Sequence, residues 1–347
     1  MTYRTHTRHS QRRNTNDNRR YQLKDLPRLW LSIVKITVIW GRHVNTKVDY
    51  LIGVDGGGSG TRVAIALANG NELARGAAGT SALRHGADAA WRAVMTAITN
   101  AFSTIGLALP EIAQMAIGLG LSGVHNKQWA AQFAEKDPGF ALLRLETDAC
   151  TTLMGAHKGR AGTIVALGTG SVGEALLEDG SHREVGGWGF PCGDEAGGAW
   201  IGLRAMNAAQ RVLDGRCPPG GFTNAVITHC GGHRDAVFNW LACAGQADYA
   251  QLTWIVLHWS ATDITAKQIM QEAGREVADI AWALDNSETL PIALCGGLAG
   301  YMHTYLPDNL RARIVAPQGD SVSGALVLIQ QAISKNNSEQ PCTARTT

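Results

Sequence analysis

Residues 50–76 read YLIGVDGGGSGTRVAIALANGNELARG, and this stretch decides the fold. The apolar run at 50–54 predicts a strand, and a glycine-rich loop follows at 56–60. A second strand then leads to the turn signal Asn69-Gly70 and a third strand. The same order of features recurs in TIVALGTGSVGEALLEDGSHREVGG (163–187), with Asp179-Gly180 at the turn. Two similar units in one chain predict a duplicated domain.

The composition is that of a globular chain with an excess of glycine. The 347 residues suit one large or two medium domains, and 45% of them are hydrophobic. Glycine contributes 41 residues, about 12% against a usual ~7%. Because no collagen repeat accompanies it, we expect the glycines in loops that need unusual backbone angles or close approach to a ligand.

Charge is distributed unevenly along the chain. Residues 1–48 carry eleven Lys and Arg against Asp17 and Asp25, whereas the remainder carries 20 basic and 27 acidic residues. The acidic remainder argues against a nucleic-acid partner. The apolar run at 29–40 is too short for a membrane span. Seven cysteines without a C-x-x-C pair are typical of reduced thiols, so we expect a cytoplasmic protein.

The two ends of the chain lack helical or strand periodicity. For 1–48 we expect disorder, or an over-extended reading frame, because Val48 directly precedes the first strand and GTG, a valine codon, can start translation. A basic arm for nucleic acid or anionic lipid is the alternative. Residues 334–347 are expected to form a loose tail.

Both glycine loops predict a phosphate site, because backbone N–H groups exposed in such turns bind anions and hydroxyls add donors. Asp55 ends the first strand, and an acid beside a polyphosphate is tolerable only with an intervening cation, which predicts Mg²⁺. The alternative is that the glycines only make tight turns. The candidate phosphate-binding residues are Gly56, Gly57, Gly58, Ser59 and Thr61 in the first loop and Gly168, Thr169, Gly170 and Ser171 in the second.

Other nucleotide and metal motifs are not supported. Residues 168–173 and 118–123 match G-x-G-x-x-G, but a hairpin follows the first, and no strand ending in an acid follows the second. A Walker A sequence is absent. His229, Cys230 and His233 lack a fourth partner at zinc spacing.

Two stretches predict helices. Apolar residues at helical spacing form one stripe over 88–102, and 240–285 is rich in Ala, Trp and Leu, which is typical of paired helices. Strands followed by helices, twice over, indicate an α/β protein with two lobes.

Six segments occur in the order IGVDGGGSGTR (52–62), ETDACTTLMGA (146–156), ALGTGSVG (166–173), GGWGFPCGDEAGGAWIG (186–202), LCGGLAG (294–300) and GDSVSGALVLI (319–329). In this order they resemble the BadF/BadG/BcrA/BcrD ATPase family, in its N-acetylglucosamine/glucosamine kinase branch of the actin, hexokinase and Hsp70-like superfamily. The resemblance covers about residues 50–330. It implies a two-lobed, duplicated actin-like ATPase (ribonuclease H-like) fold with the nucleotide in the interlobe cleft. The expected lobes are 49–148 with a return helix at 320–333, and 149–319.

The resemblance also implies an activity: ATP-dependent phosphorylation of the 6-hydroxyl of N-acetylglucosamine, or alternatively of glucosamine, with ATP and Mg²⁺ as cofactors. It makes Asp148 the general base, although its place between a strand and a helical run also suits a helix N-cap. Gly296 and Gly297 would admit the adenine–ribose moiety, or make a plain strand-to-helix turn. Asp320 is expected to cap the last helix.

The segment 186–202 is implied to hold the sugar. Trp188 offers a flat apolar face to a pyranose ring, unless it is an ordinary core residue, and Asp194 accepts hydrogen bonds from hydroxyls. Relatives often carry an asparagine where Ala82 stands, and Ser81 or Arg84 are candidates to replace it. The residues expected to line the sugar are Gly187, Trp188, Gly189, Asp194 and Glu195, although Glu195 alternatively orients a neighbour.

Two other function classes stay open. One is an ATPase that activates a radical dehydratase or reductase, in which paired cysteines hold an iron–sulfur cluster; Cys150 and Cys192 lie near the expected cleft but lack ligand-like spacing. The other is a non-catalytic sugar sensor, which the presence of Asp148 disfavours. The partners expected are ATP and an amino sugar, with a homodimer as the assembly we consider.

Overall fold

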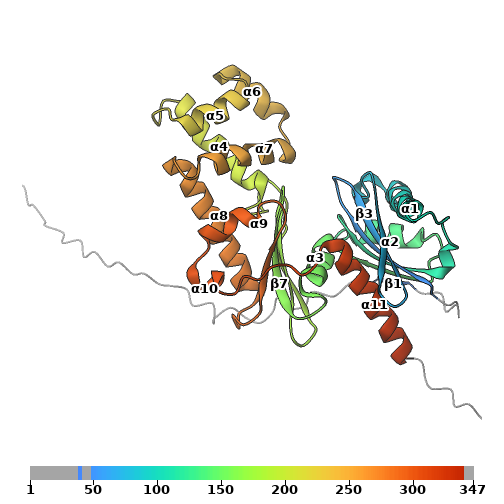
Figure 1. Cartoon of the computed structure of the whole chain (residues 1–347). Helices are drawn as coiled ribbons and strands as arrows, with labels where there is room; N and C mark the ends of the chain where they lie inside the picture. Colours follow the sequence, from blue (N-terminus) through green and yellow to red (C-terminus); the bar gives the residue numbers. More distant parts are fainter. Residues whose placement is uncertain (1–37, 41–47, 340–347) are drawn as a thin grey trace, which may run out of the picture. The chain divides into compact units, whose positions relative to one another are not determined.

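The structure, a computed structural model, describes residues 38–40 and 48–339 (Figure 1). Its strands form a six-stranded sheet in the order β1-β6-β5-β2-β3-β4 and a four-stranded sheet in the order β10-β7-β8-β9. None of the described helices is long and apolar enough to cross a membrane.

The first sheet is built on the sequence 50–76. β2 (Tyr50–Gly56), β3 (Thr61–Leu67) and β4 (Glu72–Ala78) form an antiparallel meander. β5 (Met115–Leu121) lies parallel to β2, and β6 (Leu142–Glu146) lies parallel to β5. The carboxyl ends of β2, β5 and β6 therefore share one edge of the sheet.

The second sheet repeats this arrangement. β7 (Gly162–Leu167), β8 (Ser171–Leu176) and β9 (His182–Gly186) form a second antiparallel meander, and β10 (Ile292–Cys295) lies parallel to β7. Both predicted turns are present, with Gly70 at φ 91° and Gly180 at φ 79°, where glycine avoids a steric penalty. The predicted duplication is confirmed in the two sheets.

Helices cover both faces of the first sheet (Figure 1). On one face α1 buries Trp91, Val94, Ile98 and Phe102 against the strands, which confirms the stripe predicted for 88–102. On the other face α11 packs through Val322, Leu326 and Ile329. The helices are α1 (Ala87–Thr104), α2 (Lys127–Glu135), α3 (Asp148–His157), α4 (Gly198–Leu213), α5 (Gly221–His229), α6 (Arg234–Cys243), α7 (Gln246–Trp259), α8 (Ile264–Leu284), α9 (Ala299–Met302), α10 (Asp308–Arg311) and α11 (Ser321–Glu339).

The helices predicted within 240–285 are α7 and α8, which form the second core together with α4 and α5. α3 connects the two sheets in the chain and crosses α11 closely. A Cβ atom placed on Gly324 would lie 1.8 Å from the carbonyl oxygen of Thr151, and one on Gly155 would lie 2.0 Å from that of Asp320. Only glycine permits this approach of two helix backbones.

The ends of the described chain differ in part from expectation. Val38–Trp40 form β1, which pairs with β6 in the register Trp40↔Leu143, so disorder does not hold for these three residues. Residues 1–37 and 41–47 lie outside the described residues. α11 continues to Glu339, so 334–339 are helix rather than tail, because no proline or glycine interrupts the run after Gly324.

Candidate functional site

The carboxyl-terminal edge of the first sheet gathers three titratable side chains. Asp55 is the last residue but one of β2, His125 follows β5, and Asp148 begins α3 just after β6. Charges at Asp55 and His125 both act on the Asp148 carboxyl, which places the three groups within electrostatic range. Parallel strands bring such residues together because their carboxyl ends meet at one edge.

Asp148 is not the cap of its helix. Thr147 is the N-cap, and its hydroxyl accepts a hydrogen bond from the backbone N–H of Cys150 at 3.0 Å. Burial raises the pKa of the Asp148 carboxyl, and the neighbouring Asp55 carboxylate raises it further, against smaller opposing effects of the Ala149 N–H and His125. The capping alternative is therefore wrong, and the carboxylate is left for another role.

The first glycine loop presents some of its predicted donors and buries others. Ser59 is exposed, whereas Thr61 is 1% exposed and its hydroxyl donates to the carbonyl of Gly79 at 2.6 Å. The Thr61 hydroxyl also lies 2.8 Å from that of Ser81. Thr61 and Ser81 thus hold the two ends of the hairpin together rather than facing a ligand.

The glycines of this loop differ in their surroundings. A Cβ on Gly56 would lie 2.0 Å from the Ser81 hydroxyl, and one on Gly57 would meet nothing within 4 Å. A Cβ on Gly58 would lie 3.3 Å from Nη2 of Arg84, so this guanidinium reaches the loop. Arg84 thereby places a permanent positive charge where the sequence predicts phosphate.

Asp55 and Arg62 face each other across β2 and β3 and form an ion pair. The Asp55 side chain retains 16% exposure, and its charge reaches Asp148. Two oxygen-donor carboxylates near one another fit the ligand preference of Mg²⁺. The residues present therefore fit the predicted ion, with Asp55 as the residue that would hold it.

The second glycine loop is fixed against the start of α4. The N–H groups of Gly198 and Ala199 donate to the carbonyls of Gly168 and Thr169 at 2.8 and 2.9 Å. Gly168 and Thr169 are exposed, whereas Ser171 is buried and its hydroxyl donates to the Glu195 carbonyl at 2.5 Å. Thr169, rather than Ser171, is the hydroxyl this loop offers to a phosphate.

The same loop contacts two other predicted segments. A Cβ on Gly170 would lie 2.2 Å from Oδ2 of Asp194. One on Gly296, which has φ 90°, would lie 2.4 Å from the carbonyl oxygen of Leu167 at the end of β7. Gly297 meets nothing within 4 Å. The structure therefore brings the second glycine loop together with both the predicted sugar segment and the predicted adenosine loop.

The predicted sugar segment exposes its aromatic ring and buries its carboxylate. Trp188 is 88% exposed, so the alternative that it belongs to the core is wrong. Asp194 is buried; Oδ1 accepts from the N–H of Gly189 at 2.9 Å, and Oδ2 accepts from Gln246 on α7 at 3.0 Å. Burial raises the pKa of the Asp194 carboxyl, against these two hydrogen bonds.

Asp194 therefore shapes the loop that carries Trp188. Gly187 and Gly189 have φ of 70° and 89°, which favour glycine at both turns of that loop. Glu195 is half-buried and contributes its backbone carbonyl to Ser171. Of the five predicted residues, Gly187 and Trp188 are exposed, and Trp188 is the one that presents an aromatic face.

Two further residues were missed by the sequence analysis. His125 lies 3.7 Å from Glu184 of β9, linking residues from the two sheets. Burial raises the pKa of the Glu184 carboxyl, and the charge of His125 opposes this. The signal for His125 was its place after a buried strand whose parallel neighbours carry Asp55 and Asp148.

Comparison with known proteins decides the family. The sequence profile of the BadF/BadG/BcrA/BcrD ATPase family matches residues 52–328, which is most of the chain. The chain belongs to the BadF/BadG/BcrA/BcrD ATPase family. The matched range includes both glycine loops, Asp148 and the segment of Trp188, so the resemblance drawn from the six motifs is confirmed.

Two proteins with similar sequences are named as sugar kinases. A glucosamine kinase of Vibrio cholerae is 31% identical over 281 residues, covering 81% of this chain and 95% of its own. An N-acetylmuramic acid/N-acetylglucosamine kinase of Clostridium acetobutylicum is 26% identical over 302 residues, covering 81% of this chain and 98% of its own.

A solved structure shares the fold closely. A Chromobacterium violaceum protein proposed to be an N-acetylglucosamine kinase is 50% identical, with a TM-score of 0.78, covering 81% of this chain and 99% of its own. The predicted duplicated actin-like ATPase fold of this BadF/BadG/BcrA/BcrD family member is thereby confirmed.

Proposed function

We propose that this carbohydrate kinase transfers the γ-phosphoryl group of ATP to the 6-hydroxyl of N-acetylglucosamine, with Asp148 as the general base. The observation that carries the proposal is the Asp148 carboxyl, whose pKa is raised by burial and by Asp55, at the sheet edge where the first phosphate loop also lies. A base with a raised pKa accepts the proton of the attacking hydroxyl more readily. The kinase relatives support the reaction class.

The remaining residues take positioning roles. Ser59 and Thr169 are exposed on the two glycine loops and donate to phosphate oxygens, with Arg84 adding charge at the first loop. Mg²⁺, held through Asp55, would neutralise charge on the phosphate oxygens. Trp188 supplies the apolar face on which the sugar ring stacks, and Gly297 leaves room for the adenosine.

Glucosamine is the second candidate acceptor, because the Vibrio cholerae relative is a glucosamine kinase. In this chain Ser81, one candidate to replace the family asparagine, is fully buried, and Arg84 extends toward the phosphate loop instead. We therefore expect the residues that select the acetyl group to lie around Trp188.

A coupled ADP-release assay with Mg-ATP and single sugars tests the proposal. The sugars are N-acetylglucosamine, glucosamine, glucose and N-acetylmannosamine, with a sugar-free control. We expect release that depends on N-acetylglucosamine. Dependence on glucosamine alone would select the second acceptor, and equal release in every well would favour the ATPase-activator class.

The Asp148→Asn variant tests the base. We expect kcat to fall by about 10²-fold or more, while ATP binding is retained because the amide keeps the shape of the carboxylate. Asp137→Asn is the matched control, since Asp137 is half-buried, as Asp148 is, and lies before β6 at the opposite end of the strand from Asp148. Full turnover by Asp148→Asn would refute the assignment.

A further inference from the structure

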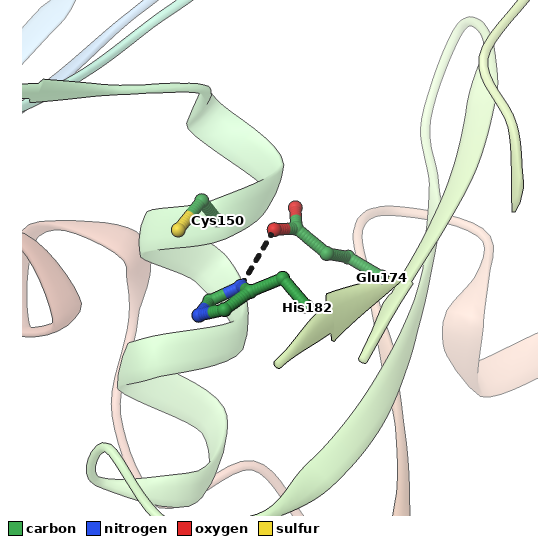
Figure 2. A group of neighbouring side chains, drawn as sticks. All are labelled: Cys150, Glu174 and His182. Carbon is green, nitrogen blue, oxygen red and sulfur yellow. Dashed lines mark hydrogen bonds and ion pairs between the residues drawn. The ribbon is translucent and has the colours of Figure 1, made fainter. Parts of the chain in front are cut away.

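Three side chains with metal-ligand chemistry converge beside the first turn of α3 (Figure 2). They are Cys150 of α3, Glu174 of β8 and His182 of β9, and one ligand atom from each lies within 4.8 Å of the others. No role in the proposed kinase reaction uses any of them.

Strand register and helix packing create this arrangement. Glu174 pairs with Glu184 and Leu176 pairs with His182 across β8 and β9, so Glu174 and His182 are diagonal neighbours on one face. α3 packs on the second sheet through Leu153 and Ala156, with Leu176 against the same cluster. Cys150 lies one turn before Leu153 on the helix, and it therefore faces the two strand residues.

The negative charge of the buried carboxylate in this cluster favours the binding of a cation. Glu174 is 6% exposed, and its Oε2 is buried without a hydrogen-bond partner among the described residues. Among the residues that the structure describes, Oε1 has a contact with the Nδ1 atom of His182 at 3.4 Å, drawn as the dashed line in Figure 2. A second carboxylate, Glu184, stands directly opposite on β9. A buried carboxylate with an unpartnered oxygen is costly unless a positive charge compensates it.

We propose that Cys150, Glu174 and His182 bind a zinc ion. A thiolate, an imidazole and a carboxylate are all zinc ligands, and three protein ligands leave the fourth tetrahedral position to water. Mg²⁺ does not suit this set, because it prefers oxygen ligands alone. The zinc site is therefore separate from the Mg²⁺ site at Asp55 and does not depend on the proposed kinase reaction.

The spacing is compatible with zinc after a small contraction. Zinc–ligand bonds of about 2.0–2.3 Å in a tetrahedron place ligand atoms about 3.5 Å apart. The Glu174–His182 separation of 3.4 Å already matches this value. Sγ of Cys150 already lies within 4.8 Å of the other two ligand atoms, so it would need to move by no more than about 1.3 Å to reach the zinc spacing.

A bound ion would fasten the start of α3 to the hairpin of β8 and β9. Cys150 lies two residues after Asp148 in the first turn of α3, so the ion would hold this turn in place against the second sheet. The ion does not itself touch the reacting groups in this arrangement.

Metal titration of the full chain tests the site directly. After chelator treatment and dialysis, Zn²⁺ is titrated in competition with a chromophoric chelator, and Co²⁺ is added in a parallel sample. We expect one Zn²⁺ per chain and a thiolate-to-Co²⁺ charge-transfer absorption in the near ultraviolet. Cys150→Ser and His182→Gln should each weaken Zn²⁺ binding by at least about tenfold, and Cys150→Ser should remove the Co²⁺ band.

Matched controls are Cys243→Ser and His229→Gln, which change the same residue types on α6 and α5, away from the cluster. Circular dichroism establishes that each variant is folded. Because the Co²⁺ spectrum of the unsubstituted chain needs no variant, its lack of a thiolate band would overturn the proposal even if the variants misfold. Zinc binding that persists unchanged in folded Cys150→Ser and His182→Gln would overturn it equally.

Discussion

At the residue scale, the Asp148 carboxyl is controlled by two neighbours of opposite charge. Burial and Asp55 raise its pKa, whereas His125 lowers it. As the base that we propose, Asp148 must be deprotonated to accept a proton, so we expect activity to be lost as the pH falls through this raised pKa. The acid limb of the kcat/KM profile therefore reports the balance of charges at the sheet edge.

Removal of His125 shifts this limb in a defined direction. In His125→Gln the charge that favours the Asp148 carboxylate is lost, so the acid limb should move to higher pH. The pH dependence of kcat/KM for the sugar measures the shift, with His229→Gln as the control. A limb that stays in place or moves to lower pH would contradict the electrostatic role of His125.

At the element scale, the sequence predicted the features that a few adjacent residues specify on their own. Asn69-Gly70 and Asp179-Gly180 specify tight turns by themselves, and the hairpins that they close, β3–β4 and β8–β9, formed as expected. The hydroxyl of Thr61 was predicted to face phosphate, yet it is buried against Gly79 and Ser81, some twenty residues away in the chain. Burial of a side chain depends on tertiary partners, which a loop motif does not contain.

The same limit explains the residues that were missed. His125 belongs to no motif, and only the parallel pairing of β2, β5 and β6 brings it to Asp55 and Asp148. Cys150 was weighed as a cluster ligand by its spacing to other cysteines, whereas its neighbours in space are Glu174 and His182. This cluster could be predicted only if the pairing of β8 with β9 and the packing of α3 were already known.

The crossing of α3 and α11 depends on small residues at the contact. In Gly324→Ala the new Cβ would lie 1.8 Å from a backbone oxygen of α3, so the two helices must separate. We expect the free energy of unfolding to fall by about 3 kcal/mol. Urea denaturation measures it, and Gly300→Ala on α9 is the control because its Cβ meets nothing within 4 Å. Equal stability of the two variants would mean that the crossing tolerates separation.

At the scale of the whole molecule, an ion pair joins the start of the last helix, α11, to strand β4 of the first sheet. Asp320 caps α11 by accepting from the N–H of Ser323 at 2.9 Å, as the sequence predicted, and it also pairs with Arg75 of β4. Although burial opposes it, the hydrogen bonds from Arg75 and Ser323 lower the pKa of Asp320 to about 2. Stability from this pair is therefore present above the ordinary pKa of 3.8 and lost as the pH falls toward 2.

A double-mutant cycle of Arg75→Gln and Asp320→Asn isolates this contribution, because asparagine keeps the helix cap and removes only the charge. Both side chains are partly exposed, so we expect a coupling free energy of about 1 kcal/mol at pH 7. Urea denaturation at pH 7, 4 and 2 measures the coupling, which should become clearly smaller at pH 2, where Asp320 is partly protonated. A coupling that is the same at pH 7 and pH 2 would show that shape rather than charge joins α11 to β4. A coupling that decreases on acidification would instead establish that the last helix is held on the first sheet in part by an ion pair between residues 245 positions apart in the chain.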